Sequence, residues 1–439
     1  MARKLAPRVV IVTLGCSKNL VDSERIGAAF AAAGWRVCYD VDPRRGDVLI
    51  LNTCGFIGDA KEESVNYILR AERLRQEGFL KKLIVMGCLA QRYRSELPTE
   101  IPNVDAWYGV NDESQLLSDC AVPLAARSLR LPSTPRHFAY LKIAEGCDRS
   151  CAFCAIPAIR GRFHSEEEHT LLREAEELAA RGVKELILVA QELTYYGRER
   201  GQRDALVPLL EKLAAIDGIA WLRLHYAYPH DFPPALVDWM AREPKACHYL
   251  DIPVQHANDA VLRSMRRAHS QAQTVELIER LRRQIPDIAL RTTLIVGYPT
   301  EGEREFAELL DFVRWAQFEH LGAFPYSAEE GTHAAATLVD VVPQEEKQRR
   351  YDELMRLQRG IAEQVRGRRV GAVVSVLVES KMEEGLWVGR TPYDSPEIDG
   401  EVHVAAPAGA LHEGEIYPVR LSSVLDYDFE GEVVERGGE

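Results

Sequence analysis

Three cysteines stand in the run Glu145-Gly-Cys147-Asp-Arg-Ser-Cys151-Ala-Phe-Cys154, and no fourth residue of metal-binding type completes the set nearby. Three thiolates can hold three irons of a cubane [4Fe-4S] cluster and leave the fourth iron open. An open iron can bind a small molecule as well as carry electrons. The spacing therefore predicts a reactive cluster rather than a purely structural one.

Two plainer interpretations of this triplet are possible, and the spacing favours neither. A structural zinc site takes four ligands in a closed tetrahedron, whereas His164 and His169 lie beyond a turn at Gly161 and an acidic run. Bacterial ferredoxins place two residues between their first cysteines and add a fourth cysteine before proline. Here three residues separate Cys147 from Cys151.

Three more cysteines each follow a predicted β-strand in the N-terminal part of the chain. The strands cover residues 9–14, 48–53 and 83–86, and they end in Gly15-Cys16, Cys54-Gly55 and Gly87-Cys88. Helical patterns between them predict parallel strands with crossover helices. Because open parallel sheets bind ligands at the carboxyl ends of their strands, we expect the three thiols to converge. The neighbouring glycines would let the backbones approach closely.

The alternative for this second triplet is three ordinary buried cysteines, which are common in protein cores. We give that interpretation to Cys38, Cys120 and Cys247, because they lack the strand-end pattern.

The elements that must position the first triplet begin after a Pro-, Ser- and Arg-containing linker at 123–136. Strands are predicted at 138–144, 185–190, 220–225, 249–254, 289–296 and 320–326, with helices at 166–181, 206–216, 274–284 and 303–315 among them. Six such units favour an incomplete (β/α)6 barrel over a doubly wound sheet. The cysteine loop follows the first strand, at the end of the barrel where active sites lie.

The C-terminal part begins with a charged amphipathic helix at 344–366. Five short strands follow at 370–379, 385–389, 401–405, 415–421 and 429–434, separated by Gly, Pro and Asp. This pattern predicts a small five-stranded β-barrel of the oligonucleotide-binding type. The fold class is thus α/β and multidomain, and we expect domains at 7–122, 133–366 and 367–435.

Composition limits the cellular setting and the partners. The 439 residues are 46% hydrophobic, and nine cysteines with no apolar signal segment or membrane-length run predict a cytoplasmic protein without a disulfide framework. From Val370 onward, 15 acidic residues face 4 basic ones, which places −11 of the formal charge of −13 in the tail.

Phe153 stands just before the last cysteine of the C-x3-C-x2-C triplet, and this signature resembles that of the radical S-adenosylmethionine (SAM) superfamily. In that superfamily the open iron is chelated by the amino and carboxylate groups of SAM. The order of the three predicted units is similar to the methylthiotransferases over essentially the whole chain. That resemblance implies a second [4Fe-4S] cluster on Cys16, Cys54 and Cys88 and a C-terminal module called TRAM.

The methylthiotransferases include tRNA-modifying members and a branch that modifies an aspartate of small-subunit ribosomal protein uS12. The tRNA branch typically carries Gln-Met-Asn after the first cysteine and Val-Val-Pro-Tyr-Thr-Arg-Gly after the last. This chain instead resembles the protein-modifying branch in strings that begin at Gly15, Asn52, Cys154 and Asp394. The acidic tail would repel tRNA phosphates and suits a basic ribosomal protein, although acidity can also serve solubility alone.

The resemblance implies that two SAM molecules serve two clusters: one methylates a cluster-bound sulfur, and the other yields a radical that removes a hydrogen from the aspartate β-carbon. It places Phe153, Glu192, Gly297 and Pro299 near SAM, while Gln255 and His256 could face the substrate. Loop packing, a solvated loop carboxylate and a strand-ending turn are the plain alternatives for the four SAM candidates.

The expected partners are uS12, an electron donor such as flavodoxin or ferredoxin and a sulfide or sulfur donor, without membrane and without nucleic acid as the primary substrate. The rival functions are a tRNA adenosine 2-methylthiotransferase and, in a different class, a non-catalytic iron-sulfur or RNA-binding protein.

Overall fold

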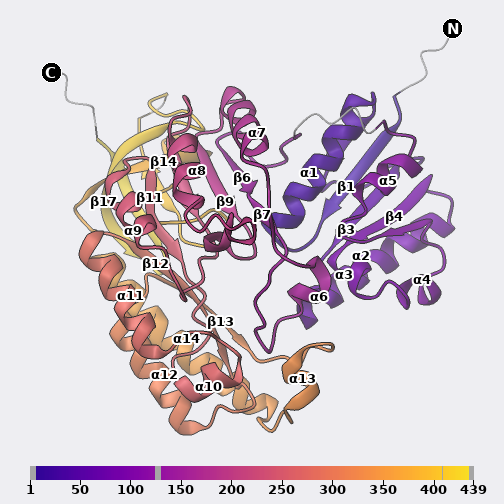
Figure 1. Ribbon diagram of the computed structural model, residues 1–439. Coiled ribbons are helices and arrows are strands. Elements are labelled where there is room, and N and C mark those ends of the chain that lie inside the picture. The colour runs from indigo at the N-terminus through magenta and orange to yellow at the C-terminus, as the bar shows by residue number, and fades with distance from the viewer. Residues whose placement is uncertain (1–5, 124–129, 408, 435–439) are drawn as a thin grey trace.

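The structure is a computed structural model that describes residues 6–123, 130–407 and 409–434. Three units follow one another along the chain (Figure 1). They are an N-terminal parallel sheet with helices, a central parallel sheet with helices, and a C-terminal closed barrel. Within the described residues, no helix is both long and apolar enough to cross a membrane.

The N-terminal sheet has the strand order β2-β1-β3-β4-β5, and its ladders are parallel. Its strands are β1 (Arg8–Thr13), β2 (Arg36–Tyr39), β3 (Val48–Thr53), β4 (Lys82–Gly87) and β5 (Ala106–Tyr108). Its helices are α1 (Ser17–Ala32), α2 (Gly58–Gln76), α3 (Cys88–Arg92), α4 (Leu97–Glu100) and α5 (Glu113–Asp119). Separate apolar clusters pack on the two sides of the sheet, and every residue of β3 is buried.

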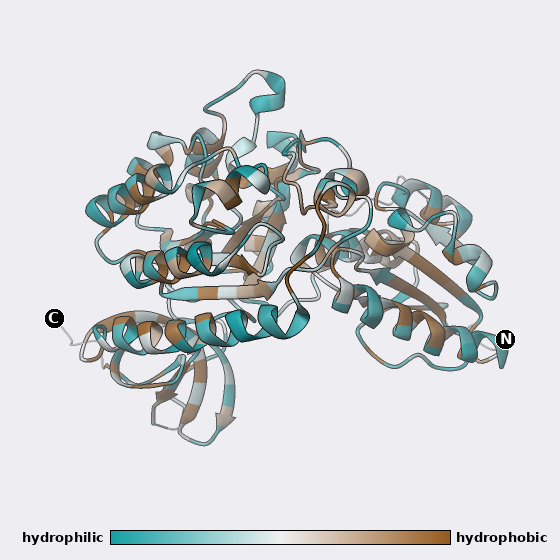
Figure 2. Ribbon diagram, turned by 90° about the horizontal axis from the view of Figure 1, so that it is seen from below, coloured by the Kyte–Doolittle hydropathy of each residue, from teal (hydrophilic) through white to brown (hydrophobic). Residues whose placement is uncertain are grey.

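The three cysteine-bearing strands agree with the sequence prediction, and two further strands were missed. β2 lies at the sheet edge with little burial, and β5 is only three residues long. Neither has the run of buried apolar residues that marks a central parallel strand. In Figure 2 the central strands of this sheet are coloured as hydrophobic between their helices.

The central sheet is an open, fully parallel six-stranded sheet of order β13-β12-β11-β10-β9-β6, as predicted. Its strands are β6 (Phe138–Lys142), β9 (Glu185–Val189), β10 (Trp221–Leu224), β11 (Ala246–Asp251), β12 (Ala289–Val296) and β13 (His320–Pro325). Its longer helices are α7 (Glu168–Ala180), α8 (Leu206–Ala214), α9 (Pro234–Arg242), α11 (Gln271–Gln284) and α12 (Glu303–Ala316).

Short elements complete the loops of this domain. They are β7 (Ala144–Glu145), β8 (His164–Ser165), α6 (Ile156–Arg160), η2 (Leu193–Tyr195), η3 (Arg198–Arg200), α10 (Asp259–Ser264) and α13 (His333–Thr337). The predicted strand 138–144 therefore divides into β6 and β7. Helix α9 was not predicted, and it begins at a Pro-Pro pair that reads as a turn in sequence.

Helix α14 (Gln344–Gly367) packs against β13 and α12 and leads into the C-terminal unit. That unit is the predicted five-stranded closed barrel, in the order β14-β15-β16-β18-β17. Its strands are β14 (Val373–Glu383), β15 (Leu386–Arg390), β16 (Val402–Ala405), β17 (Ile416–Leu425) and β18 (Asp428–Val433). Figure 2 shows α14 running between the barrel and the rest of the chain.

Residues 123–136 were predicted as a linker, and 124–129 lie outside the described residues. Beyond them the chain is anchored at Arg130, which is 2% exposed. Arg130 pairs with Glu24 of α1 and, at 2.9 Å, with Glu174 of α7. A buried cation thus joins the N-terminal and central domains.

The central sheet has two different faces. The outer face, with Leu141, Leu188 and Leu224, packs against the surrounding helices. We call the opposite face the inner face. Because side chains alternate along a strand, it carries Glu185, Arg223, Tyr249, Asp251 and Arg291. We call the end of the inner face at the strand starts its lower part and the end at the carboxyl ends of the strands its upper part. The C-terminal barrel covers the lower part, where its Leu377 packs with Trp221 and Tyr249.

Candidate active site

The cysteines at the ends of β1, β3 and β4 lie together, as the strand pattern predicts. Gly15 has φ +99°, and a Cβ there would lie only 2.7 Å from the Cβ of Cys54. A Cβ on Gly55 would lie 2.8 Å from the backbone nitrogen of Leu89, next to Cys88. The three strand-end loops therefore pack directly on one another because glycine leaves the space.

The three thiols of this N-terminal triplet differ in their electrostatic setting. Burial raises the pKa of Cys88 to about 12 and also raises the pKa of Cys54. Burial alone would raise the pKa of Cys16, but Lys18, Arg160 and backbone N–H groups outweigh it, so that pKa is lowered. Cys16, at the N-terminal end of α1, is the thiol whose anionic form the fold favours most.

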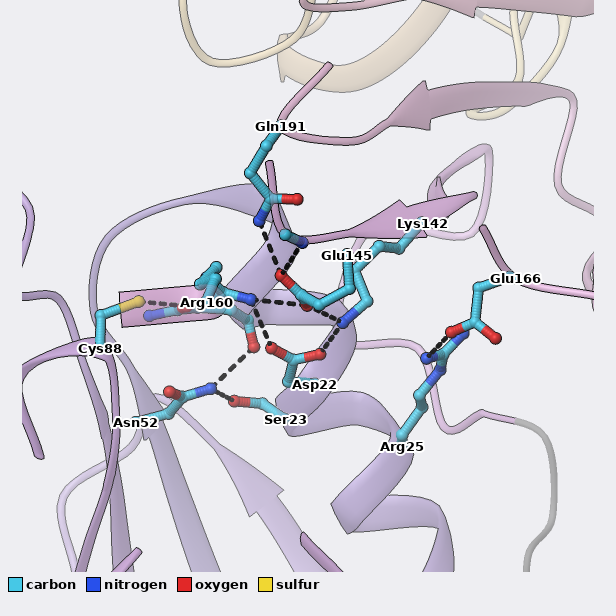
Figure 3. Close-up of polar contacts among 12 residues, drawn as sticks. Asp22, Ser23, Arg25, Asn52, Cys88, Lys142, Glu145, Arg160, Glu166 and Gln191 are labelled. Atoms are coloured by element: carbon cyan, nitrogen blue, oxygen red, sulfur yellow. Dashed lines mark hydrogen bonds and ion pairs between the residues drawn. The ribbon is translucent and has the colours of Figure 1, made fainter. Parts of the chain in front are cut away.

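Arg160 connects this triplet to the central domain (Figure 3). It ends α6, six residues after Cys154, and is 2% exposed. Its guanidinium donates to Asn19 Oδ1 and, at 2.8 Å, to Glu145 Oε2, and it interacts with the Cys88 thiol. The central domain thus supplies a buried cation to the cysteines of the N-terminal domain.

The second triplet occupies a single loop between β7 and α6. Backbone bonds hold the loop, since Cys147 N donates to the Gly161 carbonyl at 3.1 Å and Ala152 N donates to the Met265 carbonyl at 2.8 Å. Burial raises the pKa of Cys147 to about 11 and that of Cys154 to about 12. These thiols influence one another electrostatically, which places them close together.

A different set of cations surrounds the second triplet. Arg267 lies 3.5 Å from Cys151 Sγ and also donates to the Pro253 carbonyl. Arg149, inside the loop, stacks 4.3 Å from the centre of the Tyr228 ring, and Arg267 stacks 4.1 Å from it. Positive charge next to the thiols would offset the negative charge of a thiolate-ligated cluster.

Both triplets have the donor chemistry of a cubane cluster. All their thiols are free, and none forms a disulfide. Among the described residues, no three His, Cys, Asp or Glu side chains gather tightly enough to hold a single metal ion. A cubane places each thiolate on a different iron, so its ligands stand farther apart than those of one ion.

A cavity of about 620 Å³ is bordered by segments next to both cysteine sets, although no cysteine lines it. Its walls include residues 56–59, which follow Cys54 by two positions, and Phe153, which precedes Cys154. Gln255, Thr293 and Ile295 line it from the upper part of the inner face, and Phe324 of β13 borders it with half of its surface exposed. Both cysteine-bearing loops therefore border one cavity.

The four SAM candidates have different surroundings. Phe153 lines the cavity and packs on a small apolar cluster. Glu192 is buried and accepts two bonds from Arg149, at 2.6 and 2.8 Å. A Cβ on Gly297 would lie 2.3 Å from Lys347, so helix packing already requires glycine there. Pro299 follows in the same turn, half-buried and outside the cavity lining.

The two substrate candidates also separate. Gln255 lines the cavity, and its contact with the substrate stays a prediction. His256 does not face it, because its ring is fully buried, with Nε2 3.0 Å from Glu301 and Nδ1 accepting from the Asn258 backbone. The alternation of side chains turns it away, and it is a structural histidine. Cys38, Cys120 and Cys247 lie apart from both triplets, in β2, at the end of α5 and in β11.

The cations of the site were not predicted from the sequence: Lys18, Arg149, Arg160 and Arg267. Three of them are close to cysteines in sequence, so a search for basic residues near the triplets would have found them. Arg267 could be found only from the fold.

The comparisons with known proteins follow the three structural units. The chain matches the Uncharacterized protein family UPF0004 at residues 8–109, the Radical SAM superfamily at 141–313 and the TRAM domain at 370–434. A Ribosomal protein uS12 methylthiotransferase RimO of Bacteroides thetaiotaomicron is 46% identical over 98% of this chain and 99% of its own length. Proteins of that name from Christiangramia forsetii and Porphyromonas gingivalis are also 46% identical, over at least 97% of this chain and 94% of their own.

This chain belongs to the uS12 methylthiotransferase family. The membership agrees with the resemblance to the protein-modifying branch. Among solved structures, the radical S-adenosylmethionine methyltransferase TsrM from Kitasatospora setae matches with TM-score 0.53 and 13% identity, over 87% of this chain and 79% of that chain. At 13% identity this similarity supports only the fold of this chain.

Proposed function

We propose that this chain is a radical SAM methylthiotransferase that adds a methylthio group to the β-carbon of an aspartate in ribosomal protein uS12. The observation that carries the proposal is that segments next to two separate three-cysteine sets border one cavity, with residues 56–59 after Cys54 and Phe153 before Cys154. One set can serve the radical chemistry and the other can hold the sulfur to be transferred, and both must reach the same substrate atom.

Two [4Fe-4S] clusters form the proposed cofactor set, one on Cys147, Cys151 and Cys154 and the other on Cys16, Cys54 and Cys88. When bound, the clusters and SAM supply an oxidising radical for a C–H bond and a methylated sulfur. The chain's own residues position these groups. Arg160 and Lys18 provide positive charge to the N-terminal set, and Arg149 and Arg267 to the second set.

Glu192 is the proposed partner of the SAM amino group. In the structure it binds the guanidinium of Arg149, which shows that its carboxylate is held where a cation can reach it. We expect the SAM ammonium to compete with Arg149 for this carboxylate. Phe153 would pack beside SAM, while Gly297 and Pro299 would shape the turn next to it.

The substrate class rests on the family and on charge. The close relatives carry the name uS12 methylthiotransferase. The C-terminal barrel belongs to the acidic tail, so its field favours a basic protein over tRNA phosphates. The further partners that we propose are a flavodoxin or ferredoxin as reductant and a sulfide or sulfur donor, with the reaction taking place in the cytoplasm.

Reconstituted protein, SAM, a strong reductant, sulfide and purified uS12 make up the test. The expected product is uS12 in which one aspartate has gained a methylthio group, detected by mass spectrometry. Iron analysis should give about eight irons per chain and about four when Cys16, Cys54 and Cys88 are replaced by alanine. That variant should still cleave SAM, whereas alanine at Cys147, Cys151 and Cys154 should abolish cleavage.

Total tRNA serves as the competing substrate. Methylthio transfer to adenosine in tRNA, with unmodified uS12, would favour the tRNA activity. Protein that binds iron but consumes no SAM under reducing conditions would overturn the enzymatic proposal altogether.

A further inference from the structure

Lys18 is a buried lysine on the first turn of α1, two residues after Cys16. It is 8% exposed, and its ammonium lies 3.6 Å from the centre of the Tyr226 ring, across the boundary between the N-terminal and central domains. The side chain therefore leaves the N-terminal domain and points to the upper part of the inner face.

Lys18 differs from the other buried lysines of the described chain. Lys142 pairs with Asp22 and Glu145, and Lys347 pairs with Asp340 at 2.6 Å. Within residues 6–123, 130–407 and 409–434, no carboxylate lies within 4 Å of the Lys18 ammonium. A ring face replaces only part of the hydration that a buried ammonium loses. Burial alone would lower the pKa of Lys18, but Tyr226 and Cys16 outweigh it and raise that pKa, so the side chain is a cation without a carboxylate partner.

Its partner Tyr226 is held in an unusual conformation. Tyr226 follows β10 and has φ +63°, which is rare for a residue with an aromatic side chain. The left-handed backbone breaks the alternation of the strand, so His225 and Tyr226 both turn toward the inner face. Strain of this kind is found at binding and catalytic sites, where the surrounding fold maintains it.

The same region contains a second polar group without a partner. Asp251, the last residue of β11, is 4% exposed, and its Oδ1 has no hydrogen-bond partner. Lys18 influences Asp251 and His225 electrostatically, although neither pairs with it. A cation next to Cys16 that has no carboxylate partner thus acts electrostatically on a carboxylate whose Oδ1 has no hydrogen-bond partner.

We infer that Lys18 binds the side-chain carboxylate of the substrate aspartate and holds it beside Cys16. This inference rests on the proposed function, and it assigns a positioning and specificity role to a residue outside the cluster ligands. The aspartate β-carbon is bonded directly to the carboxylate carbon. A carboxylate on Lys18, two residues from Cys16, would therefore place the β-carbon next to the proposed source of sulfur.

The test is a binding cycle between the reconstituted full chain and whole uS12. Mass spectrometry of the wild-type product first identifies the modified aspartate. The dissociation constants of natural uS12 and of uS12 with that aspartate changed to asparagine are then measured against wild type, Lys18→Met, Lys18→Arg and Lys81→Met. Lys18→Met keeps side-chain length and removes the charge. Lys81 is exposed just before β4, so Lys81→Met is the matched control.

Wild type and Lys81→Met should bind natural uS12 about 30-fold more tightly than the asparagine form, the effect typical of a buried charge pair that loses one partner. Lys18→Met should bind both forms equally, at the level of the asparagine form. Lys18→Arg should keep part of the preference. Iron per chain is measured for every variant, and iron content and SAM cleavage without uS12 should stay at wild-type levels in Lys81→Met.

Two results would overturn the inference. One is a Lys18→Met protein that still prefers natural uS12 by the wild-type factor. The other is equal weakening of both forms together with loss of iron, which would mean that Lys18 serves the cluster instead. A wild-type enzyme that neither binds nor modifies uS12 would instead refute the proposed function itself, and this arm is read first.

Discussion

The lower and upper parts of the inner face of the central sheet differ in how their charges are paired. In the lower part, Glu185 is bonded by Arg223 and Arg390, each at 2.6 to 2.7 Å. Asp399 accepts from Tyr249 and from Arg291, at 2.8 and 2.6 Å. These partners come from the central sheet and from the C-terminal barrel, so the lower charges fasten two domains together.

In the upper part Lys142 pairs with Asp22 and Glu145, but two other charged groups lack such partners. Lys18 has an aromatic ring in place of a carboxylate, and one oxygen of Asp251 has no hydrogen-bond partner. Unpaired buried charge is unfavourable for folding and is retained where function requires it. The unpaired groups therefore occur in the upper part of the face, and they distinguish it from the lower part better than burial does.

Loss of Arg390 should have the largest effect on stability. Arg390 is 1% exposed and binds Glu185 and Glu379, each at 2.7 Å. Arg390→Met would leave two carboxylates short of a partner, and breaking a buried pair costs about 3–5 kcal/mol. Chemical denaturation should show this loss, while SAM cleavage by the folded variant stays unchanged.

Arg420→Met provides the control for Arg390→Met. Arg420 is exposed on the same barrel and donates to the Gly371 carbonyl, so its loss should cost well under the amount expected for Arg390. If Arg390→Met were as stable as Arg420→Met, the lower region would not have the structural role that we assign to it.

The pH dependence of the unfolding free energy should also differ between the lower and upper parts, and the second-largest effect is expected at Glu185. Burial alone would raise the pKa of Glu185, but Arg223 and Arg390 outweigh it and lower that pKa from 4.5 to about 2. The folded state then holds its proton less tightly than the unfolded state. This contribution, about 3 kcal/mol, is complete above pH 4.5 and is lost as the pH falls toward 2.

Glu185→Gln should flatten this part of the pH profile. The free energy of unfolding of wild type and variant is compared between pH 5 and pH 2.5 by denaturant titration. The difference between the two proteins should shrink as the pH falls, and a constant difference would contradict the assignment.

The reactive cysteines could be predicted from the sequence, whereas the ion pairs that join the domains could not. The cysteine spacing at 147–154 and the strand-end cysteines at 16, 54 and 88 could be found because each depends on local pattern. The string that begins at Asp394 was noticed as similar to the protein-modifying branch, but its role was not visible. In the structure Asp394 and Asp399 are buried against Arg366 and Arg291, where they join domains.

The contacts that could not be predicted from the sequence have a common physical cause. Pairing between residues such as Arg390 and Glu185, 205 positions apart, follows from how the domains pack and leaves no local signal. His256 follows a strand end in the same way as Gln255, and only the backbone direction at that point turns one toward the cavity and the other into the core.

Asp251→Asn should have the opposite sign to Arg390→Met. Burial raises the pKa of Asp251 from 3.8 to about 6, so the ionised carboxylate destabilises the fold at neutral pH. The penalty is up to about 3 kcal/mol above pH 6 and disappears as the pH falls toward 4. The variant should unfold at a higher denaturant concentration at pH 7 and transfer the methylthio group more slowly.

Asp251→Asn and wild type should become equally stable near pH 4. If the variant were instead less stable than wild type at pH 7, Asp251 would belong with the paired charges of the lower region.

The smallest effect is expected on the outer surface of α14, where ion pairs are plentiful but largely open to solvent. Arg349 bonds Glu303, Glu346 and Glu353 at 2.6 to 3.0 Å, yet 45% of its side chain is exposed. Water and salt screen such pairs, so Arg349→Ala should cost at most about 1 kcal/mol and less at high salt. Denaturation at two salt concentrations measures this. Arg349 has three carboxylate partners and Arg390 has two. If Arg349→Ala and Arg390→Met lost similar amounts of unfolding free energy, burial would not be what makes the pairs of the lower region strong.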